Sequence, residues 1–238
     1  ELHEILTDDN NVAVGVLTKS GKQIDCQYVG LAAGVSPNID FVKESKIETD
    51  RGILVNRSFE TSEKDVYAIG DCAEFKQPVD GRKSIEQVWY TGKIMGETLA
   101  EIMIGNPVEY NPGHWFNSAK FFDLEYQTYG QVHNKLLEGQ DEFVYTHVNA
   151  KILLHFIFEK DSLTFIGINS FGIRLRHLLF NDWLLKGATI EEVLVNLKTA
   201  NFDPEFYSSY ENEIVSQFNQ KFGTTLKIAK AKWWQTLM

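Results

Sequence analysis

A glycine and an aspartate in the first third of the chain could bind a nucleotide. Residues 65–69 form an apolar run that reads as a buried strand, and Gly70 and Asp71 follow it directly. In an open α/β sheet, ligands lie at the carboxyl ends of the strands. A ligand could approach the Gly70 backbone closely, Asp71 offers acceptors to sugar hydroxyls, and the next N–H groups could face a pyrophosphate. The pair could equally do no more than cap a strand, because Gly-Asp is common at turns.

The cysteines and histidines show no spacing that predicts a redox or metal centre. Cys26 and Cys72 form no Cys-x-x-Cys pair and are too few for a disulfide framework or a four-thiolate metal site. His155 and Glu159 would lie on one face of a strand about 13 Å apart, too far for a metal pair. The following histidines are isolated, and we predict structural or solvent-facing roles for them: His114, His133, His147 and His177.

A strand before Gly70 and a helix after it are the elements that would position the site. Residues 52–55 read as a short strand, and residues 85–104 read as a helix that ends at Gly105, with Pro107 just beyond. Near the start of the chain, strands predicted over 12–17 and 23–31 flank a turn in which Gly21 supplies the positive φ of a hairpin.

Beyond residue 111 the pattern predicts an antiparallel sheet followed by helices. Aromatic and β-branched runs predict strands over 121–129, 142–149, 151–159 and 162–168. Helices are predicted over 173–186, 190–198, 204–222 and 225–235. The second of these helices begins with a capping box of Thr189 and Glu192. The fold class predicted from these elements is α/β and α+β.

Length and charge exclude several classes of protein. The chain has 238 residues, enough for one large domain or two small ones. Its 33 acidic and 23 basic residues leave a net charge of −10, the wrong sign for general nucleic-acid binding. No apolar run approaches the roughly 18 residues of a membrane helix. The first residues lack a signal peptide, so we predict no membrane association and a cytoplasmic location.

The residues around Gly70 resemble the second flavin-binding motif of the FAD-dependent pyridine nucleotide-disulfide oxidoreductases, especially their ferredoxin-, rubredoxin- and nitrite-reductase-like members. The matching spacing is a threonine, six residues and Ala-Ile-Gly-Asp over 61–71. Residues 28–38 resemble the segment in which the family's chain leaves the NAD(P)H domain and re-enters the FAD domain. Residues 52–56 resemble a strand of that FAD domain, and residues 85–96 resemble the helix whose N-terminus points at the flavin ring.

This resemblance implies FAD-binding roles for six residues and no catalytic or metal-binding residue. Asp71 would hydrogen-bond the ribityl chain, and Gly70 would allow close approach. The backbone of Cys72 and Ala73 would lie near the pyrophosphate, so Cys72 would not be redox-active. The backbone of Gln87 and Val88 would face the N1/O2 edge of the isoalloxazine, where a helix N-terminus stabilises negative charge on the reduced flavin.

The resemblance also implies a domain division. Residues 1–35 would end the NAD(P)H-binding domain, and residues 36–110 would form the second portion of the FAD-binding domain. Residues 111–238 would form the family's C-terminal interface domain, an antiparallel sheet with helices, through which a homodimer could form; the likeness itself reaches about residue 200, and residues 201–238 match nothing in the family. NAD(P)H would be the co-substrate, and no electron acceptor is assigned.

The chain lacks two of the family's motifs. It contains no Gly-x-Gly-x-x-Gly, whereas the family carries two such phosphate loops. We therefore expect both loops to lie before Glu1. The chain would then be a C-terminal fragment that binds no FAD alone. A His-Pro-Thr-x-x-Glu motif is also missing, which argues against glutathione- or lipoamide-reductase-type chemistry. The alternatives are a non-enzymatic dimerisation or partner-docking module and a small α/β protein that binds another nucleotide.

Overall fold

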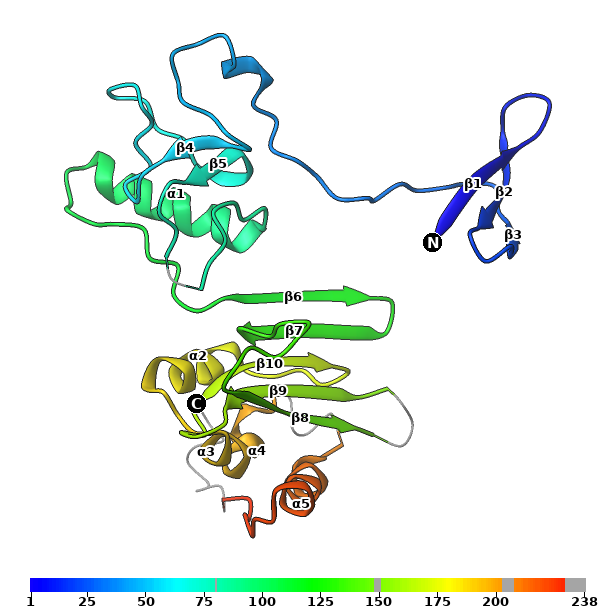
Figure 1. Cartoon of the computed structure of the whole chain (residues 1–238), viewed down its shortest axis with the longest axis vertical. Helices are drawn as coiled ribbons and strands as arrows, with labels where there is room; N and C mark the ends of the chain where they lie inside the picture. Colours follow the sequence, from blue (N-terminus) through cyan, green and yellow to red (C-terminus); the bar gives the residue numbers. More distant parts are fainter. Residues whose placement is uncertain (80, 148–150, 203–207, 230–238) are drawn as a thin grey trace. The chain divides into compact units, whose positions relative to one another are not determined.

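The computed structural model describes residues 1–79, 81–147, 151–202 and 208–229. The chain divides into two compact units, Glu1–Asn38 and Ile39–Met238. Figure 1 shows the elements of both units, with colours that follow the sequence from the N-terminus to the C-terminus. The second unit contains all six predicted cofactor-binding residues.

The first unit is a three-stranded antiparallel sheet of β1 (Leu2–Thr7), β2 (Ala13–Thr18) and β3 (Gln23–Asp25). Gly21 adopts the predicted positive φ, 80°, in the turn before β3. The predicted strand over 23–31 is too long, because β3 pairs with β2 only from Gln23 to Asp25. A last hydrogen bond joins the Cys26 N–H to the Val14 carbonyl at 3.2 Å, and the later residues form no strand.

The second unit begins with a small α/β region that carries the predicted site. Strands β4 (Ile53–Val55) and β5 (Ala73–Phe75) pair in parallel, and helix α1 spans Trp89–Met103. Two 3₁₀ turns, η1 (Asp40–Val42) and η2 (Gly70–Cys72), precede β4 and β5 respectively. A hydrophobic core shared by these elements includes Val55, Phe59, Ala73 and Met95. Helix α1 begins four residues later than predicted and ends as predicted, with Gly105 at φ 89°.

The buried strand predicted over 65–69 is wrong. Residues 65–69 make one isolated bridge, between Tyr67 and Glu60, and Val66 and Tyr67 are 38% and 36% exposed. Backbone bonds from Thr61 N–H to the Val66 carbonyl and from Ala68 N–H to the Phe59 carbonyl turn this segment back on the preceding loop. Gly70 and Asp71 therefore lie in η2, which enters β5, and not at the carboxyl end of a strand.

The rest of the second unit is a five-stranded antiparallel sheet in the order β6-β7-β10-β9-β8. Its strands are β6 (Phe116–Phe121), β7 (Leu124–Gly130), β8 (Gln140–Thr146), β9 (Leu153–Glu159) and β10 (Phe165–Phe171). The helices that follow are α2 (His177–Lys186), α3 (Ile190–Val195), α4 (Leu197–Ala200) and α5 (Glu211–Phe222). The antiparallel sheet followed by helices agrees with the predicted fold class.

Alternating strand residues explain which sheet face the helices cover. Leu154, Phe156 and Phe158 of β9 point to the same side, because side chains alternate along a strand. All three belong to a core that also contains Phe180 of α2 and Phe218 of α5. The helices therefore cover the sheet face that bears these three residues.

Several predicted boundaries in this region need correction. The strand predicted over 121–129 begins only at Leu124, because the chain turns at Phe122 (φ 51°) between β6 and β7. Asn196 divides the helix predicted over 190–198 into α3 and α4, although the capping box of Thr189 and Glu192 is confirmed. Helix α5 begins at Glu211, and residues 225–229 are not helical. The rest of those two helix predictions, 204–207 and 230–235, lies outside the described residues.

Candidate cofactor-binding site

The η2 turn presents an open backbone. Gly70 has φ 79°, a left-handed conformation that favours glycine. A Cβ built on Gly70 would meet no other atom within 4 Å, so the space above this residue is free. The N–H of Ala73 donates to the Gly70 carbonyl and closes the turn.

The predicted residues that follow Gly70 differ in exposure. The Asp71 side chain is exposed, and its carboxylate has no hydrogen bond or ion pair with any described residue. Cys72 is half-buried, and its Sγ lies 3.7 Å from the Ile69 carbonyl oxygen. Ala73 is fully buried. Asp71 is therefore the side chain of this turn that is available to a ligand.

A buried carboxylate that was not predicted from the sequence, that of Glu74, lies just after the turn. Glu74 accepts hydrogen bonds at 2.9 Å from the N–H groups of Arg51 and Gly52, and one at 3.0 Å from the Arg51 guanidinium. Burial by itself raises the pKa of Glu74, but these hydrogen bonds and the Arg51 charge outweigh it, so the pKa lies below its ordinary value. In the sequence, this buried carboxylate is indicated by a charged residue that stands between Ala73 and Phe75 in a short apolar strand.

The N-terminus of α1 offers free hydrogen-bond donors. The N-cap residue, Val88, has extended backbone and no side-chain cap, and the first helical turn contains no acidic residue. The first helical bond runs from the Gly92 N–H to the Val88 carbonyl at 3.1 Å. The N–H groups of Trp89, Tyr90 and Thr91 therefore have no partner within the helix, and they carry the positive end of its dipole.

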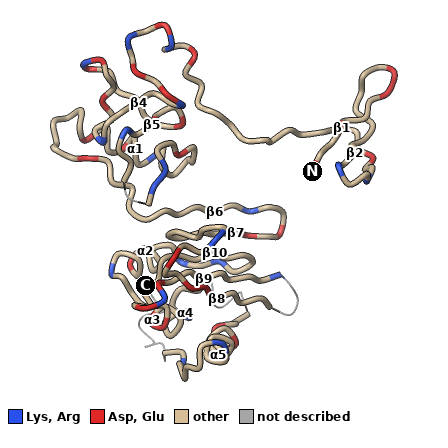
Figure 2. The backbone as a smooth tube through the Cα atoms, in the orientation of Figure 1, with Lys and Arg blue, Asp and Glu red and all other residues tan. Residues whose placement is uncertain are grey.

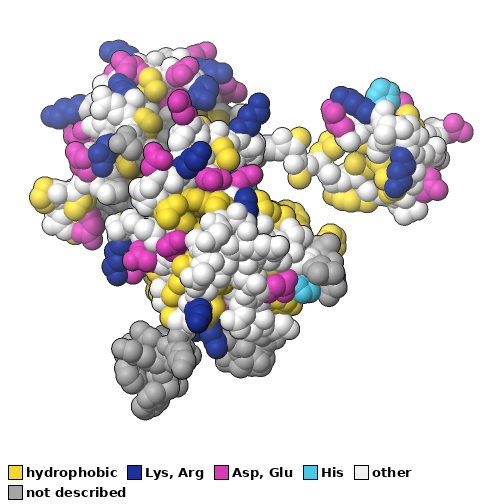
Figure 3. All heavy atoms as spheres, turned by 60° about the horizontal axis from the view of Figure 1, so that its bottom comes forward, with side chains coloured by type: hydrophobic (Ala, Val, Ile, Leu, Met, Phe, Trp, Pro, Cys, Tyr) yellow, Lys and Arg dark blue, Asp and Glu magenta, His cyan; other side chains and the backbone are white. Residues whose placement is uncertain are grey.

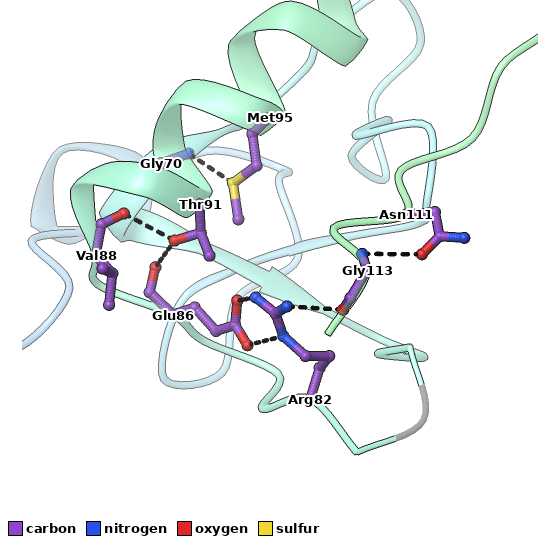
Figure 4. A network of polar contacts seen from close by, with 8 residues as sticks. All are labelled: Gly70, Arg82, Glu86, Val88, Thr91, Met95, Asn111 and Gly113. Carbon is purple, nitrogen blue, oxygen red and sulfur yellow. Dashed lines mark hydrogen bonds and ion pairs between the residues drawn. The ribbon is translucent and has the colours of Figure 1, made fainter. Parts of the chain in front are cut away.

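Helix α1 and the η2 turn lie side by side. The Gly70 N–H donates to Sδ of Met95, in the second turn of α1, at 3.2 Å (Figure 4). The six predicted residues thus fall on two neighbouring segments, the η2 turn with Ala73 and the two residues before α1. An exposed carboxylate and a set of free N–H donors on these segments could hold a ligand with hydroxyl and electron-rich groups.

Other kinds of site find no support in the described part of the chain. It holds no group of three or more His, Cys, Asp or Glu that could bind a metal, and both cysteines are free thiols. His155 contacts Glu142 on the adjacent strand at 2.8 Å, while Glu159 lies further along its own strand. Figure 2 shows acidic and basic residues interspersed along the backbone. No described helix combines the length and apolar character needed to cross a membrane.

Comparison with known proteins identifies a family whose sequences are similar to that of this chain. Residues 1–94 match the family model described as pyridine nucleotide-disulphide oxidoreductase. NADH-rubredoxin oxidoreductase of Clostridium acetobutylicum is 47% identical over 72 residues, which cover 30% of this chain and 17% of that protein. The assimilatory nitrate reductase electron transfer subunit of Bacillus subtilis is 36% identical over 205 residues, 84% of this chain and 25% of that protein.

Solved structures of low sequence identity share the fold. An NAD-dependent persulfide reductase from A. fulgidus matches 98% of this chain and 46% of its own, with a TM-score of 0.69 and 23% identity. An FAD-dependent pyridine nucleotide-disulphide oxidoreductase from Desulfovibrio vulgaris matches 91% of this chain and 55% of its own, with a TM-score of 0.62 and 22% identity.

The predicted resemblance to the FAD-dependent pyridine nucleotide-disulfide oxidoreductases is confirmed. The chain spans 17% and 25% of the length of the two curated relatives described above.

Proposed function

We propose that this chain contributes the second flavin-binding segment and the C-terminal interface domain of an FAD-dependent NAD(P)H oxidoreductase. The observation that carries this proposal is the uncapped N-terminus of α1, a helix that contacts the η2 turn, together with the Asp71 carboxylate of that turn, which has no partner among the described residues. When bound, FAD would accept electrons from NAD(P)H and pass them to an acceptor. The protein's own contribution is to bind and orient the flavin and to stabilise its negative charge.

Each segment would meet a different part of the cofactor. The Asp71 carboxylate would accept hydrogen bonds from ribityl hydroxyls, and Gly70 would leave room above the turn. The backbone of Cys72 and Ala73 would lie near the pyrophosphate. The backbone of Gln87 and Val88, with the free N–H groups of α1, would face the N1/O2 edge of the ring. The open space above Gly70 and the unpaired donors and acceptors are consistent with this set of roles.

The domain division and the partners are part of the same proposal. Residues 1–35 would end the NAD(P)H domain, residues 36–110 would complete the FAD domain, and residues 111–238 would form the interface domain of a homodimer. The separate hydrophobic core of the sheet and its helices supports the last of these assignments. A relative named for rubredoxin favours a small redox protein as the class of acceptor.

Substitution of Asp71 tests the proposal in the full-length parent. We expect Asp71→Ala to weaken FAD binding roughly 10- to 100-fold, because a hydrogen bond to a charged group contributes about 1.5–3 kcal/mol. Flavin absorbance that remains after desalting would measure the loss. Asp123→Ala, which removes an exposed carboxylate in the turn between β6 and β7, is the control. Unchanged FAD retention in Asp71→Ala would favour a non-enzymatic docking module.

A titration of the present chain with FAD tests its part in the site. We expect no flavin spectrum to survive desalting, because the phosphate loops that supply the pyrophosphate contacts are not in this sequence. Visible absorbance and gel filtration of the same sample would measure binding and oligomeric state together. Retained flavin would show that residues 1–238 suffice for binding and would contradict the fragment proposal.

A further inference from the structure

A buried ion pair lies immediately before the flavin-facing residues of the proposed site. The side chains of Arg82 and Glu86 are only 6% and 5% exposed. The Arg82 Nε donates to Glu86 Oε1 at 2.6 Å, and Nη2 donates to the second carboxylate oxygen, so the contact is bidentate. We call these two residues the clamp.

The clamp joins two segments that are distant in sequence. Arg82 Nη1 donates to the carbonyl oxygen of Gly113 at 3.0 Å, and the guanidinium lies 5.2 Å from the ring centroid of Trp115. Gly113 is held in turn, because its N–H donates to the Asn111 side chain at 3.2 Å. Figure 4 shows Arg82 between Glu86 and Gly113. The clamp thereby ties the residues before α1 to the segment that leads into β6.

Helix α1 holds the same residues from the other side. The buried Thr91 hydroxyl lies 2.8 Å from the Val88 carbonyl oxygen and 3.3 Å from the Glu86 carbonyl oxygen (Figure 4). The side chain of Glu86 is therefore fixed by Arg82 while its backbone is next to α1. The Gln87–Val88 backbone between these two attachments has little freedom to move.

The energetics favour a positioning role over a stabilising one. Two charges removed from water incur a desolvation penalty that their attraction often only balances, so a buried ion pair is weak evidence for stability. A bidentate guanidinium–carboxylate contact does, however, impose a narrow geometry. Pairing with Arg82 also engages both oxygens of Glu86, so this carboxylate is not available to cap the nearby free N–H groups of α1.

We propose that Arg82 and Glu86 are positioning residues that hold the Gln87–Val88 backbone, and with it the free donors of α1, in place for the flavin. This inference rests on the proposed function. The clamp acts through backbone position and does not itself contact the cofactor.

Amide hydrogen exchange in the present chain, without flavin, tests the positioning directly. The Gly92 N–H reports on the position of the Val88 carbonyl, to which it is bonded at 3.1 Å. We expect Arg82→Gln to increase the exchange rate at Gly92 about tenfold or more. The Ile104 N–H, bonded to the Ala100 carbonyl at the far end of α1, should exchange at the wild-type rate. An unchanged rate at Gly92 would overturn the proposal.

Two further variants separate positioning from loss of the fold. Arg57→Gln is the matched control, because Arg57 also bonds a carbonyl near this segment, that of Tyr110, and contacts the carboxylate of Glu109. We expect wild-type exchange at Gly92 in that variant. If Arg82→Gln does not fold, Arg82→Lys keeps the charge and loses the bidentate contact. It should raise the Gly92 rate by a smaller factor, and a wild-type rate would overturn the proposal.

The full-length parent distinguishes failure of this inference from failure of the proposed function. If the wild-type parent binds FAD, Arg82→Gln should shift the flavin midpoint potential, whereas Arg57→Gln should not. An unshifted potential would overturn the clamp's role toward the flavin. If the wild-type parent binds no FAD, the proposed function fails, and the Gly92 exchange rate still decides whether the clamp positions the backbone.

Discussion

Gly52 shows how a single residue type allows the site to form. Its neighbours across the parallel pair are the Cys72 carbonyl oxygen and the Glu74 Cβ, and each would lie 2.9 Å from a Cβ added to Gly52. Both atoms belong to the backbone or are bonded directly to it, so moving them away from an added Cβ would distort the backbone. The absence of a side chain at Gly52 lets its N–H reach the Glu74 carboxylate and keeps β4 against the end of the η2 turn.

We therefore expect Gly52→Ala to reduce the free energy of unfolding by about 1–3 kcal/mol, as overpacking of a tight site does. Denaturant unfolding of the chain would measure the change. Gly96→Ala is the matched control in α1, where a Cβ would meet no other atom within 4 Å. This control should stabilise the chain by up to about 1 kcal/mol, because alanine favours helix. Equal effects of the two substitutions would contradict the packing argument.

At the scale of elements, the turn between β6 and β7 contains an unfavourable residue. Phe122 has φ 51° and is 96% exposed, although aromatic residues rarely adopt left-handed backbone. The neighbouring Phe121, at the end of β6, is 71% exposed and has no such backbone. The hairpin is nonetheless formed, because β6 and β7 pair along their whole length.

Asn tolerates left-handed backbone, so we expect Phe122→Asn to raise the free energy of unfolding by roughly 0.5–1 kcal/mol. Phe121→Asn, which offers no relief of backbone strain, should give no increase. Thermal unfolding of both variants, with gel filtration beside it, would measure the difference. A lower midpoint in Phe122→Asn would contradict the strain argument, and a changed oligomeric state would mean that a second copy of the chain contacts this side chain.

For the chain as a whole, an exposed stretch forms the last part of the first compact unit, Glu1–Asn38. Tyr28, Leu31 and Val35 are 85%, 74% and 74% exposed, and the residues between β3 and η1 form no helix or strand. Figure 3 shows hydrophobic side chains at the surface of the first unit. Its exposed apolar residues include Val12 and Val14. In the proposed parent, the rest of the NAD(P)H domain would cover these side chains.

Limited proteolysis of the chain checks this division. We expect chymotrypsin to cleave first after Tyr28 or Leu31, because proteases cut exposed segments that lack regular structure. Mass spectrometry should then find a stable fragment that contains η1 and everything after it. Tyr110 and Tyr129, each 3% exposed, should resist cleavage on the same time scale. Early cleavage at these two residues would contradict the proposed compactness of the second unit.

The resemblance to the family was predicted from the sequence, whereas the contacts around the candidate site were not. The spacing of Thr61 and Gly70–Asp71 predicted a flavin-binding segment; the family comparison confirms the resemblance, and the binding roles of these residues stay a prediction. The Gly70–Met95 contact and the Arg82–Gly113 bond could not be predicted, because each joins residues whose separation along the chain says nothing about their distance in space. The strand predicted over 65–69 failed because apolar composition indicates burial but does not supply a neighbouring strand.

The local features of this protein follow from its amino-acid sequence: the hairpin turn at Gly21, the capping box of Thr189, the end of α1 and the order of sheet before helices. Each depends on the conformational preferences of a few adjacent residues. Only the tertiary structure decided that η2 lies beside α1, that Glu74 is buried under Arg51 and that Arg82 connects Glu86 to Gly113. These contacts arise from packing between distant segments, which no local pattern encodes.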